Sequence, residues 1–167
     1  MLFSTIDDQI RICEEIIRNL KENDFDISEI QYFLLKSLIV SIVSEFENYI
    51  EKIFLARANR CNDPQIINFV RNQLSQKFRS PDLKKINDTL GYFDTELKKE
   101  FLSKVENTQQ HAAWDNIMKA RHSIVHKQGI LNITLNELFS TYPETKKVIM
   151  HLVETLSLNE EEIKKYI

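Results

Sequence analysis

The chain has 167 residues, of which 43% are hydrophobic and 28% are charged, and its formal net charge at pH 7 is −3. This composition excludes a disordered chain, and the length suits one globular domain spanning residues 1–167. The negative balance argues against a protein that binds nucleic acid by bulk electrostatics. Only two glycines and three prolines occur, which favours long helices over a sheet with tight turns.

The sequence contains no run of about 18 uncharged apolar residues, so no membrane-spanning segment is predicted. Its first residues lack the basic and apolar regions of a signal peptide. Cys13 and Cys61 are far apart and show no metal-ligand spacing, which is typical of reduced thiols in a cytoplasmic protein.

Apolar residues at helical spacing predict an all-α helical bundle. The first predicted helix begins after residue 4 or 5 and ends at Asn23–Asp24. The second starts after the cap Ser28 and runs to about Arg60. Its residues 34–43 are apolar nearly all round, which predicts the long central helix of the bundle.

Three shorter helices are predicted next. The pair Asp63–Pro64 opens a helix that continues to Leu74, and Ser80–Pro81 opens another that Gly91 ends. A third, capped by Asp94, carries apolar residues through Val105.

The last part of the chain begins with a predicted helix over residues 108–128, closed by Gly129 in a left-handed conformation. The spacing from Thr134 to Glu137 is that of a capping box and opens a short helix. Pro143 is predicted to start a separate helix, and Asn159 to cap a final turn.

Basic residues gather between positions 71 and 85, where only Asp82 opposes them. One interpretation is a local surface that guides RNA, and the other is an ordinary solvated helix face. Lys127 is a further candidate for RNA contact. The basic residues of the segment are Arg71, Lys77, Arg79, Lys84 and Lys85.

Arg121 stands among apolar positions of the predicted helix 108–128. At about 100° per residue it lies between Ile117 and Val125 in projection. A guanidinium in such a stripe must be paired or must face an anion. Glu47, at the rim of the apolar face of the central helix, is either a solvated carboxylate or the partner of this guanidinium.

His122 and His126 lie about one helical turn apart, close to Arg121. A metal site would need a third ligand, and no glutamate adjoins His122, so the metalloprotease pattern fails and no metal is predicted. Ser123 projects away from Arg121, and no Gly-x-Ser-x-Gly segment supports a serine nucleophile. No Gly-rich phosphate loop or dinucleotide fingerprint occurs, so no cofactor is expected.

An arginine and a histidine without metal suit cleavage of RNA, in which the 2′-hydroxyl attacks the neighbouring phosphorus. Histidine titrates near neutrality, and arginine can hold phosphate oxygens and the charge that develops on them. The alternative is structural: Arg121 pairs with a core carboxylate, and His126 only caps a helix end. The residues alone leave both interpretations open.

The segment from Arg121 to His126 resembles the Arg-x4-His motif of the HEPN superfamily, in which Asn, Asp or His often follows the arginine, as His122 does here. The surrounding stretch 114–129 is similar to the C-terminal signature of the family, and the long helix containing residues 44–50 is similar to its central helix. The order of helices most resembles the stand-alone RiboL-PSP-type HEPN proteins.

This resemblance implies a HEPN-like bundle that forms a homodimer, in which two Arg-x4-His motifs line one composite active site. Many members are metal-independent endoribonucleases that act as toxins, some with a cognate antitoxin, or in phage defence; others are inactive binding or scaffold domains. By position, Arg121 and His126 form the catalytic pair and His122 orients them. Gln128 stands where toxins silenced by a nucleotidyltransferase carry tyrosine.

Helix geometry adds an independent requirement for a second chain. Residues five apart on a helix diverge by about 140°, so Arg121 and His126 of one chain should not converge on one phosphate. A copy related by a two-fold axis would bring more of these groups into one cleft. The leading hypothesis is therefore a homodimeric endoribonuclease, and the alternative is a non-catalytic HEPN-like domain that binds a nucleotide or a protein.

Overall fold

The computed structural model describes residues 3–23, 26–74, 77–126 and 131–166, and these contain helices and no strand. The all-α prediction is confirmed. In chain order the helices are α1 (Ser4–Glu22), α2 (Ser28–Asn59), α3 (Pro64–Leu74), α4 (Leu83–Phe93), α5 (Thr95–Val105), α6 (Gln109–Val125), α7 (Leu135–Thr155) and α8 (Glu160–Lys164).

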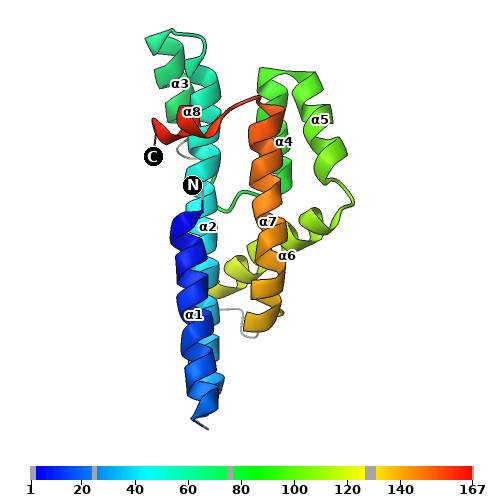
Figure 1. The fold of residues 1–167 in the computed structure, drawn as a ribbon. Helices are drawn as coiled ribbons and strands as arrows, with labels where there is room; N and C mark the ends of the chain where they lie inside the picture. The colour runs from blue at the N-terminus through cyan, green and yellow to red at the C-terminus, as the bar shows by residue number, and fades with distance from the viewer. Residues whose placement is uncertain (1–2, 24–25, 75–76, 127–130, 167) are drawn as a thin grey trace.

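Helix α2 is the central helix, as its apolar middle predicts. It contacts α1, α3, α6, α7 and α8, and it runs almost the full length of the molecule (Figure 1). At its middle, Phe46 is completely buried and stacks on Trp114 of α6 and Tyr142 of α7, with ring centroids 5.1 and 6.4 Å away. These three rings join the three helices that make up the core.

The other helices are arranged around this core (Figure 1). Helix α1 lies along the first half of α2, while α3 and α8 pack against its far end. Helices α4 and α5 pack against each other as a hairpin, and α5 also contacts α7. None of the helices in the described ranges is long and apolar enough to cross a membrane.

Several helix starts are confirmed by their capping contacts. The carboxylates of Asp63 and Asp94 accept hydrogen bonds from backbone N–H groups in the first turns of α3 and α5. Thr134 and Asn159 form capping boxes with the glutamates three residues later. Local sequence therefore decides these termini.

The predicted start of α2 is wrong in one detail, because Asp26 provides the capping group. Ser28 is already the first helical residue, and both its backbone N–H and its hydroxyl donate to the Asp26 carboxylate, at 3.0 and 2.9 Å. An aspartate two residues before a serine can bind the orphan donors of the first turn as well as the serine itself.

The predicted boundaries of α4 are also wrong. Ser80 and Pro81 do not begin the helix, because both backbones make tertiary hydrogen bonds; Asp82 instead caps it by accepting from the N–H of Lys85. Gly91 does not end it, and the helix continues to Phe93. A Cβ at Gly91 would lie 3.2 Å from Cδ of Lys98, so the glycine allows close packing of α5.

Residues 135–155 form one helix, whereas Pro143 was predicted to start a new one. Proline inside a helix removes one hydrogen bond to the carbonyl four residues earlier. The helix continues because buried residues on both sides of Pro143 hold it against the core. They are Leu138 and Tyr142 before the proline, and Val148, Ile149 and Leu152 after it.

The predicted end of α6 falls outside the described residues. Helix α6 ends at Val125, with His126 as its C-cap, whereas the sequence predicts an end at Gln128 and a stop at Gly129. Gln128 and Gly129 lie outside the described ranges.

Replacing Pro143 with alanine is expected to raise the free energy of unfolding by about 1–3 kcal/mol, because alanine restores the N–H that proline lacks and suits a helix interior. The greater freedom of the unfolded chain offsets about 0.4–1 kcal/mol of the gain. Urea unfolding measures the change as a shift in midpoint, and Met150→Ala, at another exposed site of α7, is the control. The carbonyl that Pro143 leaves without its helical donor is that of Phe139, four residues earlier. An unchanged midpoint would mean that this carbonyl already has another hydrogen-bond partner.

Candidate active site at the end of helix α6

The first half of α6 is fixed to the rest of the molecule by its cap and by Trp114. Thr108 accepts a hydrogen bond from the N–H of His111 at 3.3 Å and so begins the helix. The indole of Trp114 is completely buried and donates to the carbonyl oxygen of Pro81 at 2.9 Å. The later residues of α6 therefore project from a helix whose rotation and depth are set.

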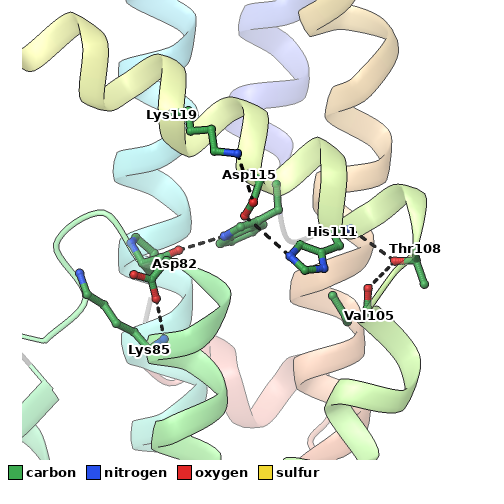
Figure 2. A network of polar contacts seen from close by, with 9 residues as sticks. Asp82, Lys85, Val105, Thr108, His111, Asp115 and Lys119 are labelled. Atoms are coloured by element: carbon green, nitrogen blue, oxygen red, sulfur yellow. Dashed lines mark hydrogen bonds and ion pairs between the residues drawn. The ribbon is translucent and has the colours of Figure 1, made fainter.

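Charged side chains follow one flank of α6 at intervals of one turn (Figure 2). Asp115 lies 4.0 Å from the imidazole of His111 and 3.5 Å from the ammonium of Lys119. Such exposed pairs contribute only about 0.2–0.5 kcal/mol each. His111 and Lys119 are thus both paired with Asp115, whereas Arg121 is paired with Glu47.

Arg121 lies where α6 leaves the core. Its side chain is 26% exposed, and its Nη2 atom is 4.0 Å from Oε1 of Glu47. Ala120 is the last buried residue of the helix; Ile124 is half-buried, and Val125 is exposed, so the apolar stripe predicted through Val125 ends earlier. Arg121 therefore stands at the border between core and solvent.

Glu47 joins three segments of the chain at this border. Its carboxylate, 24% exposed, accepts a hydrogen bond from the backbone N–H of Ser80 and faces the guanidinium of Arg121. Ser80 has a φ of 50°, which is uncommon for a residue other than glycine, and the Glu47 contact helps to hold it there. The sequence suggested Glu47 as a partner of Arg121, and the structure brings the two residues together.

The pair of Arg121 and Glu47 is loose. At 4.0 Å the two groups attract each other without a hydrogen bond, and Arg121 makes no hydrogen bond to any described residue. A partly exposed guanidinium with unused N–H donors can bind an anion in a forked geometry. This end of α6 can therefore hold a phosphate.

His122 and His126 are both exposed and lie against each other. Their ring centroids are 4.2 Å apart, and the backbone N–H of His126 donates to the carbonyl of His122 at 3.0 Å. His111 and His151 each face a carboxylate, at 4.0 and 3.2 Å, whereas His122 and His126 face none among the described residues. Two imidazoles accessible to solvent can exchange protons with a bound substrate.

The basic segment shows two kinds of side chain. Lys84 forms an ion pair with Asp88 at 2.9 Å, and Lys85 donates to the carbonyls of Arg79 and Ser80. The side chains of Arg71 and Arg79 are exposed. Only part of the predicted basic surface is thus available for a phosphate backbone.

Lys77 is half-buried, and burial lowers the pKa of its ammonium. Lys127, the remaining candidate for RNA contact, lies outside the described residues. Within the described ranges, no three His, Cys, Asp or Glu side chains gather where they could hold a metal ion.

Sequence reasoning missed Ser80 as part of this site. The only local signal was a serine before proline, which is typical of a helix start, and no pattern predicts that its N–H donates to Glu47, 33 residues earlier. The restricted backbone that precedes a proline could have marked Ser80 as unusual.

The family model of RiboL-PSP-HEPN matches residues 4–158. The resemblance predicted from the sequence is therefore confirmed. Neither a curated protein nor a solved structure matches the chain.

Replacing Glu47 with alanine is expected to lower the free energy of unfolding by about 1–3 kcal/mol, because the half-buried N–H of Ser80 loses its acceptor. Glu47→Gln keeps an acceptor and loses only the loose ion pair, so its cost should stay below about 1 kcal/mol. Chemical denaturation measures both, with Glu51→Ala on the same helix as the control. Equal losses of unfolding free energy in Glu47→Gln and Glu47→Ala would show that the negative charge of Glu47, and hence its attraction to Arg121, contributes more than the hydrogen bond from Ser80.

Proposed function

Because the chain belongs to the RiboL-PSP-HEPN family, we propose that it is a cytoplasmic, metal-independent endoribonuclease of HEPN type, acting as a toxin or in phage defence. One observation carries the proposal. A partly exposed guanidinium with unused N–H donors lies at the end of α6, one residue before His122 and five before His126, and the imidazoles of these two histidines contact each other.

The proposed reaction needs only groups of the protein and of the RNA. A base removes the proton of a 2′-hydroxyl, whose oxygen attacks the adjacent phosphorus; the bond from phosphorus to the 5′-oxygen breaks, and an acid protonates that oxygen. The products are a 2′,3′-cyclic phosphate and a 5′-hydroxyl. His126 acts as acid or base, Arg121 holds the phosphate as charge develops on it, and His122 keeps His126 in place.

An exposed face of α2 beside this site supports the proposed dimer. Phe33, Val40 and Glu47 are seven residues apart on α2, so they lie within about 40° on one face. Phe33 is 71% exposed and Val40 is 41% exposed. Ser37 and Ser44, which lie on the same face, are exposed too. An apolar face with small residues that continues to Glu47 suits an interface that places two Arg121 and two His126 side chains in one cleft.

The second candidate function is a non-catalytic HEPN-like domain that binds a nucleotide or a protein. The unused N–H donors of Arg121 favour it, since they can hold a nucleotide phosphate or a carboxylate of another protein without any cleavage. In that case Arg121→Ala would weaken ligand binding or dimerisation, and no RNA would be cleaved. If the protein is a toxin, a cognate antitoxin is its expected partner.

Wild-type protein is expected to cleave single-stranded RNA in EDTA and to leave 2′,3′-cyclic phosphate and 5′-hydroxyl ends. His126→Ala and Arg121→Ala should each lower the rate by about 100-fold or more, because each removes a group that acts in the transition state. Cleavage of a labelled oligonucleotide with analysis of its ends measures both effects. Lys119→Ala, which changes a neighbouring cation of α6, should retain activity.

The catalytic assignment fails if His126→Ala cleaves as fast as the wild type. Absence of cleavage by the wild type, together with RNA binding that depends on Arg121, would favour the non-catalytic alternative. Mixing Arg121→Ala with His126→Ala should restore part of the activity, because a mixed dimer keeps one intact arginine and one intact histidine.

Placing a charge on the α2 face is expected to separate the dimer. Val40→Glu and Phe33→Glu should give a monomer in light scattering and lose RNA cleavage, because a buried carboxylate without a partner is costly at an interface. Met150→Glu, at an exposed apolar position on α7, is the matched control. A wild type that is fully active as a monomer would contradict the shared cleft.

A further inference from the structure

A groove on the surface, separate from the candidate active site, lies between α3 and the end of α4. It is an apolar groove of about 550 Å³, and α3 and α4 contribute most of its walls. Phe69, Val70 and Gln73 line it from α3, and Thr89, Tyr92 and Phe93 line it from α4.

Two aromatic rings at the edges of the groove are unusually accessible. Phe69 is 64% exposed and Tyr92 is 79% exposed. Large aromatic side chains bury most of their surface when they serve the core, as Phe46 does in this molecule. Phe69 and Tyr92 are therefore accessible to a ligand without any rearrangement of the core.

The charge of the groove favours an anionic ligand. Among the described residues that line the groove, Lys77 is the one cation and none carries a carboxylate. The ammonium of Lys77 lies over the Tyr92 ring, 4.2 Å from its centre. The nearby carboxylate of Asp88 is already paired with Lys84 and Lys98, at 2.9 and 3.1 Å. Exposed aromatic faces beside a cation are the features with which proteins bind unpaired nucleotides.

A short segment of chain connects the groove to the candidate active site. Lys77 and Ser80 are three residues apart, so their Cα atoms lie within about 11 Å of each other. Ser80 donates to Glu47, which lies 4.0 Å from Arg121, and the exposed Arg79 lies between Lys77 and Ser80 in the sequence. A single strand of a few nucleotides is therefore long enough to extend from the groove to Arg121.

We propose that this groove is a subsite for an unpaired nucleobase of the RNA substrate, a few nucleotides along the strand from the phosphate that Arg121 holds. The inference rests on the proposed function. Phe69 and Tyr92 stack on the base, and Lys77 faces the adjoining phosphate. Because a paired base cannot enter, the groove makes the protein prefer single strands.

The test measures binding of a 2′-O-methyl single-stranded RNA, which lacks the attacking hydroxyl and cannot be cleaved. Fluorescence anisotropy is expected to show that Phe69→Ala and Tyr92→Ala each weaken binding by about 5- to 30-fold, since each removes one stacking surface. Tyr92→Phe should bind within about 2-fold of the wild type, because it keeps the ring. Met150→Ala is the control, and an RNA duplex should bind equally well to all variants.

Wild-type affinity of both alanine variants for the single strand would overturn the subsite and leave the groove to another occupant, such as an apolar peptide. Equal weakening by Met150→Ala, or for the duplex, would also overturn it. These outcomes differ from failure of the proposed function, which shows as RNA that stays uncleaved or as cleavage that does not need His126. Photo-crosslinking of a 4-thiouridine oligonucleotide to Tyr92 would support the subsite, whatever the catalytic activity.

Discussion

The stacking of Phe46 between Trp114 and Tyr142 is the interaction on which the rest of the fold depends. It joins the middle of α2 and of α7 to the first half of α6, and each of the three rings is almost fully buried. The close packing of aromatic rings leaves little freedom of rotation about a helix axis. Once α2 and α6 are fixed in this way, the positions of the residues next to the stack follow.

The candidate active site is built from those adjoining residues. Glu47 directly follows Phe46 and reaches the rim of α2, while Arg121 is seven residues after Trp114 and so shares its face of α6. The segment Ser80–Pro81 connects the two helices, since the Ser80 N–H donates to Glu47 and the Pro81 carbonyl accepts from Trp114. The apolar stack and the polar contacts thus belong to one junction.

Much of this arrangement could be predicted from the sequence, because local signals and tertiary contacts agree over most of the chain. Apolar spacing and capping residues predict the helices. Arg121 is identified as a candidate because it is a cation among apolar positions of its helix. The predictions fail where tertiary contacts override local signals, as at Pro143 and Ser80. Phe69 falls among apolar residues at helical spacing, so only the structure shows that α3 leaves it exposed.

The looseness of the contact between Arg121 and Glu47 has a consequence for the proposed chemistry. A tightly paired guanidinium would have to break strong hydrogen bonds before it could hold a phosphate, and this cost would weaken substrate binding. At 4.0 Å little is lost when Arg121 turns to an anion, and Glu47 stays in place because it still binds the N–H of Ser80. Under the proposed function, the carboxylate would therefore keep the arginine near the site in the free protein and leave it available to the RNA.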